Sequence, residues 1–599
     1  MYTNQHQFHI PVMGTGHSID SPIRVAHLGI NSVVSVVDDL LCERIRKFYA
    51  AQFQLPFDSI ARNAPDGRAK RITAFLDTMQ AIVNQKFEEV KAMPLFSNTE
   101  KDRYFTLLPD SNPLKQKYYE IAEMLDGWKK SEQINELTQL MKPGSIDVNI
   151  MAKVDALGVD EHQKPLSAEF SDASAALRGY AQSVVQSGLV LSAGFNPRLY
   201  GYLSDFKEFY RDTTGDIKKS IILKVSDFRS ALIQGKFLAK KGIEIAEFRI
   251  ESGLNCGGHA FASDGQLLPV LLREFKEKRH QLTQTFQPMI KSYYELMGWE
   301  YPELSEEAIQ PKITVQGGIG TSGEMRRLIE DFGMDGTGWG SPFLLVPEAT
   351  CVDDETMQLL ADATENELYL SNVSPLGVPF NNIRNSGSER YKLEQIEKGK
   401  PGSKCPKGFL ATNTEFTDQP ICTASLQYQI LKIDQITNSS LSDLEKEEGK
   451  QSVMEKSCLC SHLGNGSLIR LGIIKPEYGR QEICPGPNIA WFNRQYSLNE
   501  MIDHIYGRIP SIVPAKRPHM FAKEMQMYVD YLLEMARQTD PESPEMRKVN
   551  KMASNLQEGM DYCLELSTKE AYDDENLESL RLMVETQRAR IETLFAEAV

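Results

Sequence analysis

The chain lacks any stretch that would place it in or across a membrane. No apolar run reaches the roughly 20 residues that a membrane-spanning helix needs. The first seven residues carry neither the basic cluster nor the apolar core of a secretory signal. We therefore expect a cytoplasmic protein with no membrane partner.

An excess of positive charge is also lacking. The 599 residues include 66 Lys and Arg against 82 Asp and Glu, for a net charge of −16. This balance argues against a nucleic-acid partner and is better explained by solubility. A hydrophobic content of 41% and a charged content of 25% are ordinary for a soluble globular protein. The length is sufficient for several domains, each with a core of its own.

One stretch of the sequence contains several glycines followed by a residue that could act as an acid or a base. The apolar run that ends at Glu251 leads into a loop containing Gly253, Gly257 and Gly258, and this loop is followed by His259. Glycine lets backbone N–H groups approach a ligand closely, and histidine exchanges protons near neutral pH. The strand-then-glycine pattern returns at 312–320 and again at 333–341. Three such units in succession predict a phosphate-bearing cofactor at the mouth of a parallel barrel.

In this order, the motifs resemble those of the FMN-dependent nitronate monooxygenases, a group that includes the FMN enoyl-acyl carrier protein reductases. The resemblance spans about 20–375 and departs from the family at Phe261, where glycine is usual. It implies an FMN site in which the first strand passes under the flavin and the two later glycine loops hold the phosphate. The implied contacts are Ala26, His27, Leu28, Asn149, Gly257, Gly258, Gly317, Gly318, Gly320, Gly340 and Ser341.

Two of the expected flavin contacts have a competing interpretation. His27 stands where the family has proline, and it either brings a second imidazole to the flavin or ends a strand. Lys224 lies at the end of a strand and either supports the N1–C2 oxygen region of the flavin or forms a surface salt bridge. We expect no separate Rossmann domain, so NAD(P)H acting as reductant would visit the flavin itself.

His259 is the predicted proton-transfer residue. Nitronate oxidation and enone reduction both move a proton at the carbon next to the one that exchanges electrons with flavin N5. The competing interpretation is a structural histidine at the barrel rim. Cys256, three residues earlier, either faces the flavin or is a small packing residue.

Strand-like runs predict an α/β fold, a (β/α)8 TIM barrel. The expected strands are 21–30, 33–37, 146–151, 189–194, 220–225, 245–250 and the two that precede the later glycine loops. Several are continuously apolar, as strands buried on both faces are.

The barrel is expected to begin within 1–37 and to continue over 144–375. Between these parts, 38–143 shows helical periodicity and is too long for an ordinary connection. We expect this helical insertion to act as a lid over the barrel mouth or as an interface. A C-terminal helical domain is expected over 496–599, packed on the barrel or pairing with a second copy in a homo-oligomer.

The segment 376–495 is rich in Gly, Pro, Asn and Ser and contains five of the nine cysteines. We expect irregular loops in which Cys405, Cys422, Cys458 and Cys460 hold a metal, with Cys484 in reserve. Cysteine followed by proline suits a [4Fe-4S] cluster, although the spacing matches no standard ferredoxin. A structural zinc site and free cysteines are the alternatives.

Together these features predict a flavoenzyme that passes electrons through FMN with His259 as acid or base. The first expectation is a nitronate monooxygenase-like oxidoreductase. The second is an enoyl reductase of polyunsaturated fatty acid or polyketide synthesis, acting on a small-molecule or acyl substrate and docking a carrier protein. The alternative from another class is a non-catalytic flavin or metal redox sensor.

Overall fold

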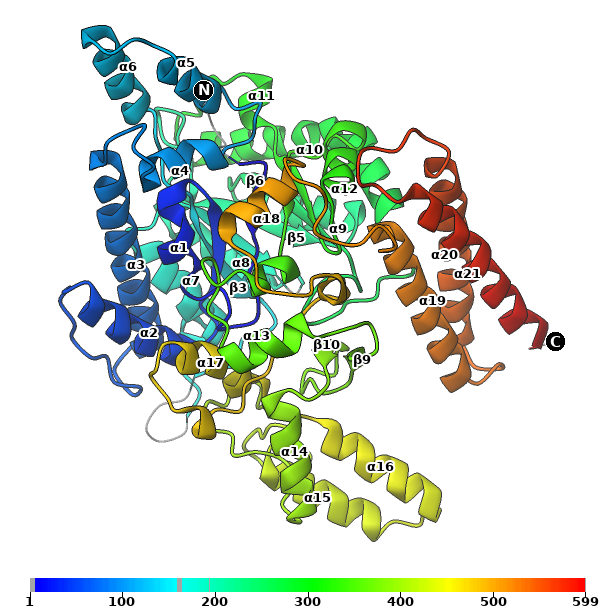
Figure 1. Ribbon diagram of the computed structural model, residues 1–599. Coiled ribbons are helices and arrows are strands. Elements are labelled where there is room, and N and C mark those ends of the chain that lie inside the picture. Colours follow the sequence, from blue (N-terminus) through cyan, green and yellow to red (C-terminus); the bar gives the residue numbers. More distant parts are fainter. Residues whose placement is uncertain (1–5, 159–163, 193, 598–599) are drawn as a thin grey trace.

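The computed structural model describes residues 6–158, 164–192 and 194–597. Within them, eight parallel strands close into a barrel in sequence order (Figure 1). This confirms the predicted TIM barrel. The strands are β1 (Phe8–Ile10), β2 (Asn31–Ser35), β3 (Ile146–Met151), β4 (Gly188–Ser192), β5 (Ser220–Val225), β6 (Ile245–Glu251), β7 (Lys312–Gln316) and β8 (Gly336–Gly338).

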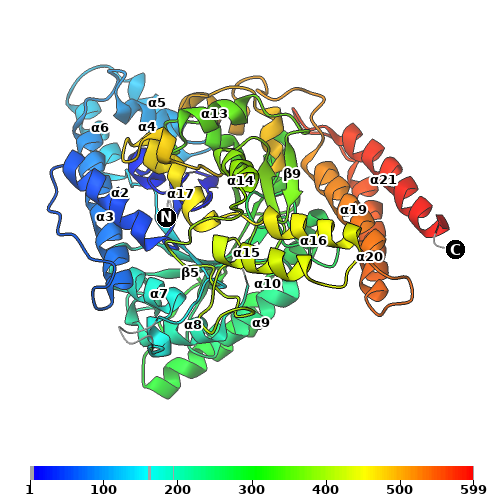
Figure 2. The same cartoon turned by 90° about the horizontal axis from the view of Figure 1, so that it is seen from below.

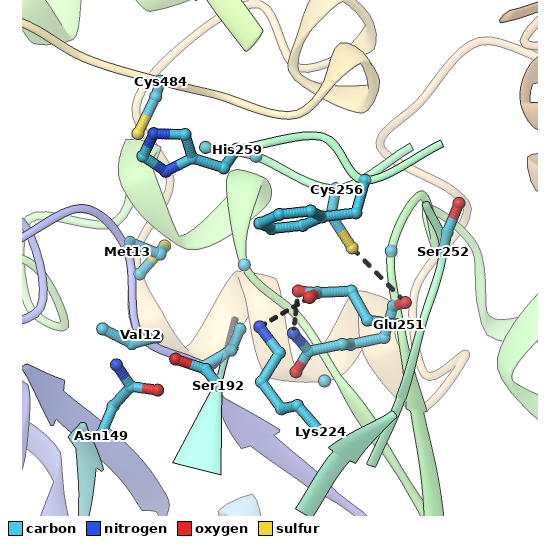
Figure 3. A pocket seen from close by; sticks show the side chains of 18 of the residues that line it. Val12, Met13, Asn149, Ser192, Lys224, Glu251, Ser252, Cys256, His259 and Cys484 are labelled. Atoms are coloured by element: carbon cyan, nitrogen blue, oxygen red, sulfur yellow. Dashed lines mark hydrogen bonds and ion pairs between the residues drawn. The ribbon is translucent and has the colours of Figure 1, made fainter. Parts of the chain in front are cut away.

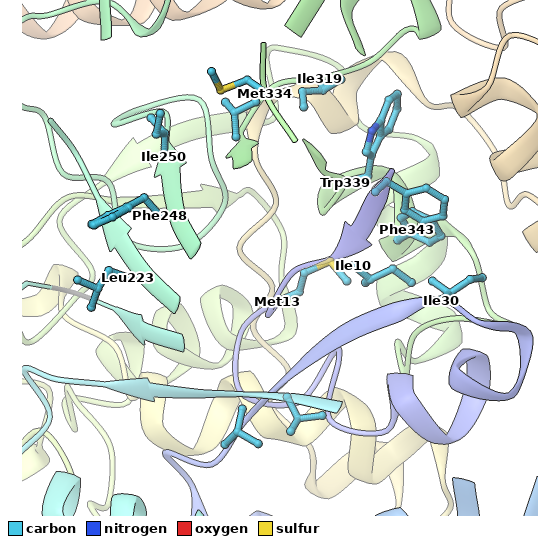
Figure 4. Close-up of a cluster of buried hydrophobic side chains, with 14 of the residues drawn as sticks. Ile10, Met13, Ile30, Leu223, Phe248, Ile250, Ile319, Met334, Trp339 and Phe343 are labelled. Atoms are coloured by element: carbon cyan, nitrogen blue, oxygen red, sulfur yellow. The ribbon is translucent and has the colours of Figure 1, made fainter. Parts of the chain in front are cut away.

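The barrel closes where β1 pairs with both of its neighbours. His9 stands opposite Asn31 of β2 and opposite Gly338 of β8. At this seam Phe8 stacks on Phe343, with ring centroids 5.8 Å apart. Figure 4 shows Ile10, Trp339 and Phe343 in the apolar cluster beside it. Burial of its side chains therefore stabilises the short strand β1, in addition to its hydrogen bonds with β2 and β8.

The prediction of a first strand at 21–30 is wrong. That stretch forms α1 (Ser21–Val25) and the 3-10 turn η1 (Ala26–Leu28). Pro22 lies in the first turn of α1, where its missing N–H costs no hydrogen bond. Gly29 ends the turn in the left-handed conformation with φ 81°. The apolar residues of this stretch are therefore buried in a short helix and turn and not in a strand.

The insertion over 38–143 is helical, as expected, but lies on the outside of the barrel. Its longest helix, α3, packs against α2 and against the barrel helix α7 (Asp172–Gln182). Both views place it at the edge opposite the C-terminal helices (Figures 1 and 2). The helices are α2 (Asp39–Gln52), α3 (Gly67–Ala92), α4 (Glu100–Leu107), α5 (Pro113–Ala122) and α6 (Trp128–Gln139).

The expectation that 376–495 is irregular holds only in part, because much of the segment is helical. Ser425 and Ser442 cap α15 and α16 with their side chains, so local capping overrides the turn-forming composition. The elements are β10 (Phe380–Ile383), paired with β9 (Leu368–Ser371), then α14 (Gly387–Glu397), α15 (Leu426–Thr437), α16 (Asp443–Glu455) and α17 (Leu459–Arg470).

Further helices complete the barrel and the C-terminal region. The barrel helices include α8 (Pro197–Tyr202), α9 (Phe228–Ala239), α10 (Leu268–Met297), α11 (Glu306–Ile309), α12 (Ser322–Arg326) and α13 (Asp354–Ala361). The C-terminal ones are α18 (Leu498–Ile505), α19 (Met520–Gln538), α20 (Met546–Leu566) and α21 (Leu577–Glu597). Helices α19 to α21 pack on one another, and α19 and α20 also contact α10. Among the described residues, no helix combines the length and apolarity needed to cross a membrane.

Candidate functional site

A cavity of about 370 Å³ opens at the carboxyl ends of the barrel strands (Figure 3). Every strand contributes to it through residues at its end or just beyond. These residues include Met13, Ser35, Asn149, Ser192, Lys224, Glu251, Gly317 and Gly338. In parallel barrels the loops that follow the strands meet at this face, which is where ligands bind.

His259 reaches the cavity from the loop that follows β6. Backbone hydrogen bonds from Ala260 N to Pro379 O (2.8 Å) and from Asn381 N to Gly258 O (2.9 Å) join this loop to the start of β10. The imidazole meets the ring of Phe380 edge-on, with centroids 4.9 Å apart. This support from a segment 120 residues later is not visible in the sequence.

The imidazole of His259 is held neutral at physiological pH. Burial, aided by the nearby positive charge of Lys153, lowers its pKa to about 4. Its Nε2 lies 2.7 Å from Oγ of Ser374, and Ser374 Oγ also accepts a hydrogen bond from Leu376 N at 3.2 Å. The serine hydroxyl and the imidazole are thus partners in one hydrogen bond, and the tautomer of the ring decides which of them is the donor.

The glycine loop after β7 presents free backbone donors to the cavity. The N–H groups of Gly317 and Gly318 have no hydrogen-bond partner in the part of the chain that the structure describes. Gly340 and Ser341, on the loop after β8, also line the cavity, as do Gly257 and Gly258. Converging N–H groups of this kind bind anions such as phosphate.

Gly320, by contrast, does not line the cavity. Its N–H donates to Oε2 of Glu324 at 2.8 Å, and its carbonyl oxygen lies 2.9 Å from Nε2 of His504. A Cβ at this position would lie 2.4 Å from Cζ of Arg517. The prediction that Gly320 contacts phosphate is therefore wrong: this glycine is required by the close packing of the C-terminal region.

Sequence analysis also passed over the G-x-G-x-x-G spacing of Gly318, Gly320 and Gly323. The pattern runs from the loop after β7 into α12 of the barrel and does not lie in a doubly wound sheet. A Cβ on Gly323 would lie 2.2 Å from the carbonyl oxygen of Asp573. Gly320 and Gly323 thus allow later parts of the chain to pack closely against this loop, so the glycine spacing does not indicate a dinucleotide site here.

The floor of the cavity combines an ion pair with polar atoms that have no partner. Lys224 Nζ lies 2.6 Å from Oε2 of Glu251, and Gln316 Nε2 donates to Oε1 of Glu251 at 2.6 Å. Lys224 is therefore neither on the surface nor unpaired. Oδ1 of Asn149 and Oε1 of Gln316 are buried without a hydrogen-bond partner among the described residues. Buried acceptors of this kind are usually satisfied by a ligand or a water molecule.

Ala26, His27 and Leu28 do not line the cavity, so their assignment to the flavin site is wrong. The ring of His27 lies beside the insertion, with Nε2 3.8 Å from Oε2 of Glu100. The first strand instead ends at Ile10, and it is Pro11, Val12, Met13 and Gly14 that enter the cavity. This stretch carries a proline, Pro11, which the sequence analysis sought at the position of His27 in the wrong segment.

The helical insertion over 38–143 contributes no residue to the cavity lining, so the lid expectation is wrong. The covering residues come from the later segment and include Leu463, Cys484 and Asn488. Cys484 is held there by its carbonyl oxygen, which accepts the N–H of Gly258 at 3.1 Å. The cysteine-bearing segment thus closes over the barrel mouth.

Cys256 lines the cavity as a packing thiol. Burial raises its pKa well above the usual range, and its Sγ donates to the carbonyl oxygen of Gln316 at 3.6 Å. Nearby, the cavity also receives Phe261, with Lys153 Nζ 4.8 Å from the ring centroid. A glycine at 261 would leave this part of the mouth open.

The structure brings four of the five predicted metal ligands into one neighbourhood. Cys405 and Cys422 are each close enough to Cys460 to interact electrostatically with it. Cys458 interacts likewise with Cys405. However, no group of three or more His, Cys, Asp or Glu side chains in the described ranges is arranged to hold a metal ion. Neither an iron–sulfur cluster nor zinc is supported.

Comparison of the chain with family models and with curated proteins gave no match. Among solved structures it is similar to FabK from Thermotoga maritima, at 12% identity and a TM-score of 0.36, covering 88% of this chain and 96% of that one. It is also similar to the enoyl reductase domain of MlnA from the macrolactin biosynthesis cluster of Bacillus amyloliquefaciens, at 13% identity and a TM-score of 0.38, covering 89% and 97%. Scores of this size carry no argument about activity, so the function is argued from the site itself.

Proposed function

We propose that this chain is an FMN-dependent oxidoreductase that reduces the carbon–carbon double bond of an enoyl thioester. The observation that carries the proposal is the buried, neutral imidazole of His259 at the cavity mouth, hydrogen-bonded through Nε2 to Ser374. A buried proton donor at the mouth of a flavin-sized cavity suits reduction, where a proton must reach the carbon next to the one that receives hydride.

The cavity fits FMN by its donors and its unsatisfied acceptors. The free N–H groups of Gly317 and Gly318, with Ser341 on the neighbouring loop, would hold the phosphate. Asn149 and Gln316 would offer polar atoms to the edge of the ring system, and Lys224 would place a cation beside it. When bound, FMN supplies hydride transfer between NAD(P)H and the substrate.

The remaining chemistry belongs to the side chains at the mouth. The neutral imidazole of His259 donates its N–H proton to the α-carbon of the thioester enolate, which is a stronger base than the imidazolate left behind. The Ser374 hydroxyl, bonded to Nε2, and the positive charge of Lys153 stabilise that anion. Phe261 and Leu463 exclude water from the mouth, which strengthens these charge interactions.

The decisive experiment uses purified protein loaded with FMN under anaerobic conditions. A short enoyl thioester should reoxidise the NAD(P)H-reduced flavin repeatedly, and the product should carry one solvent-derived hydrogen at its α-carbon. His259→Ala should abolish turnover, while His280→Ala, a substitution of an exposed histidine on α10, serves as the matched control. Reoxidation of the wild type by oxygen alone, with no thioester turnover, would reject the proposal.

Nitronate oxidation is the second candidate, because the neutral His259 imidazole also has a nitrogen able to accept a proton. An alkyl nitronate supplied with oxygen tests it directly. Turnover with the nitronate and none with the thioester would favour a monooxygenase. Flavin binding without turnover on either substrate would favour the non-catalytic sensor. Docking of a carrier protein and pairing with a second copy of the chain remain proposals, and both are accessible by co-elution of purified components.

A further inference from the structure

The glycine loop after β7 is held by side chains that come from much later in the chain. Three successive carbonyl oxygens of the loop each accept a hydrogen bond from a side chain of the segment 488–517. The bonds run from Arg517 Nη2 to Gly318 O (2.5 Å), from Asn488 Nδ2 to Ile319 O (2.7 Å) and from His504 Nε2 to Gly320 O (2.9 Å). All three carbonyl groups are thus directed toward this later segment.

This orientation leaves N–H groups of the loop available to the cavity. The C=O and N–H of a trans peptide point to opposite sides, so the bond to Gly318 O places the Ile319 N–H on the side away from Arg517. Like the N–H groups of Gly317 and Gly318, it has no hydrogen-bond partner among the described residues, and all three residues line the cavity. Gly317 and Gly318 have φ +115° and +79°, the kind of backbone that makes successive N–H groups converge on an anion.

Arg517 is the centre of this arrangement. Its side chain is only 5% exposed. Besides the bond to Gly318, Nε donates to Asn488 Oδ1 at 2.8 Å and Nη1 donates to Glu324 Oε1 at 2.7 Å. The bond to Asn488 Oδ1 directs the other end of that amide, Nδ2, to Ile319 O. Arg517 therefore orients two of the three carbonyl groups, one directly and one through Asn488.

Arg517 also compensates a buried carboxylate beside the loop. Glu324 is 1% exposed, and its Oε2 accepts the N–H of Gly320 at 2.8 Å. Its Oε1 accepts the N–H of Met520 at 2.7 Å, so the carboxylate is held in place from both sides. Without a counter-ion it would repel a phosphate bound at the loop, because charges interact strongly where water is excluded. The ion pair with Arg517 removes that repulsion.

We propose that Arg517 is a positioning residue for a phosphate monoester bound at this loop, which makes the segment 488–517 part of the cofactor site. It acts through the Gly318 carbonyl, through Asn488 and by neutralising Glu324. The inference rests on the proposed function, since it assumes that FMN binds here. Its specific consequence is a preference for FMN over riboflavin, which has the same ring system and lacks the phosphate.

The test measures the dissociation constants of FMN and of riboflavin from the full-length protein by fluorescence titration. Arg517→Met should weaken FMN binding about 10-fold or more, the scale of one hydrogen bond to a charged group, and leave riboflavin binding nearly unchanged. Arg327→Met is the matched control. Arg327 is also buried and joins the barrel to the C-terminal region through Glu575 at 2.7 Å, so its loss should not change the preference for FMN.

A double variant keeps the test decisive if the single variant does not fold. Arg517→Met leaves Glu324 buried without a counter-ion, whereas Arg517→Met combined with Glu324→Gln removes both charges. The double variant should still prefer FMN less than the wild type does, because no side chain then holds the Gly318 carbonyl. A wild-type preference in the single or the double variant would overturn the inference, as would equal weakening of FMN and riboflavin.

Failure of the proposed function gives a different result in the same titration. Wild-type protein that binds neither flavin, or binds FMN no better than riboflavin, would reject the FMN site itself and this inference with it. A wild type that prefers FMN, with variants that keep the preference, would reject only the role of Arg517.

Discussion

Nε2 of His259 lies 2.7 Å from Oγ of Ser374, a residue 115 positions later in the chain. Ser374 Oγ also accepts the N–H of Leu376 at 3.2 Å. The contact with Ser374 orients the imidazole, which is what an acid–base role requires.

His259→Ala is expected to retain FMN and lose turnover by about 10²-fold or more, the usual scale for a positioned acid or base. Ser374→Ala should lower kcat by a smaller factor and leave KM nearly unchanged, because it loosens the orientation of the imidazole and does not alter the substrate contacts. Steady-state kinetics of both variants and of the double variant measure the coupling. Additive effects of the two substitutions would show that Ser374 does not act through His259.

Gly318→Ala is expected to weaken both the fold and flavin retention. Gly318 has φ +79°, and a Cβ there would lie 2.0 Å from Nδ2 of Asn255, which donates to Met520 O at 3.1 Å. Displacing Asn255 should cost about 1–3 kcal/mol, the usual range for overpacking. The expected losses therefore come from packing beneath the loop, although the sequence suggested that glycine is needed here to leave space for a phosphate.

Gly472→Ala is the control, because Gly472 has φ +67° and a Cβ there would have no atom within 4 Å. Flavin content and thermal midpoints compare the two, and equal losses would contradict the packing argument.

Lys224→Met and Glu251→Gln are expected to shift the flavin potential in opposite directions. Lys224 and Glu251 are 2.6 Å apart at the cavity floor, where side-chain exposure is 15% and 25%. Loss of the cation should disfavour the anionic reduced flavin and lower its potential, while loss of the carboxylate should raise it. Anaerobic titration against dyes of known potential measures both. A similar drop in stability in both variants, with unchanged potentials, would make the pair structural.

Because the carboxyl group of Glu524 is buried, we expect the stability of the fold to decrease as the pH rises. Burial raises its pKa to about 7 from 4.5, while Oε2 accepts the N–H of Leu268 at 2.8 Å. Between those values the folded protein holds a proton that the unfolded chain has released. Ionisation of this group should therefore lower the free energy of unfolding by about 1.4 kcal/mol per pH unit in this range.

The Glu524→Gln variant should show a smaller decline and be more stable than the wild type at pH 8. Thermal midpoints from pH 5 to 8 test this, and Glu482, whose pKa burial also raises to about 7, accounts for a residual slope.

Local sequence determined the barrel and part of its site. Continuously apolar strands and glycines just beyond them are consequences of burial and of backbone geometry, and both are readable over a few residues. Accordingly Asn149, Lys224, Gly257, Gly258, His259, Gly317, Gly318, Gly340 and Ser341 all line the predicted cavity. The prediction of the first strand was wrong because β1 (Phe8–Ile10) is only three residues long and is stabilised by pairing with β2 and β8, whose residues lie further along the chain.

Only the tertiary structure decided what each of these residues contacts. Ser374 reaches His259, and Arg517 occupies the space beside Gly320. These contacts depend on how segments more than 100 residues apart pack against the barrel. No local pattern encodes them, because hydrogen-bonding and packing partners are chosen by the fold as a whole.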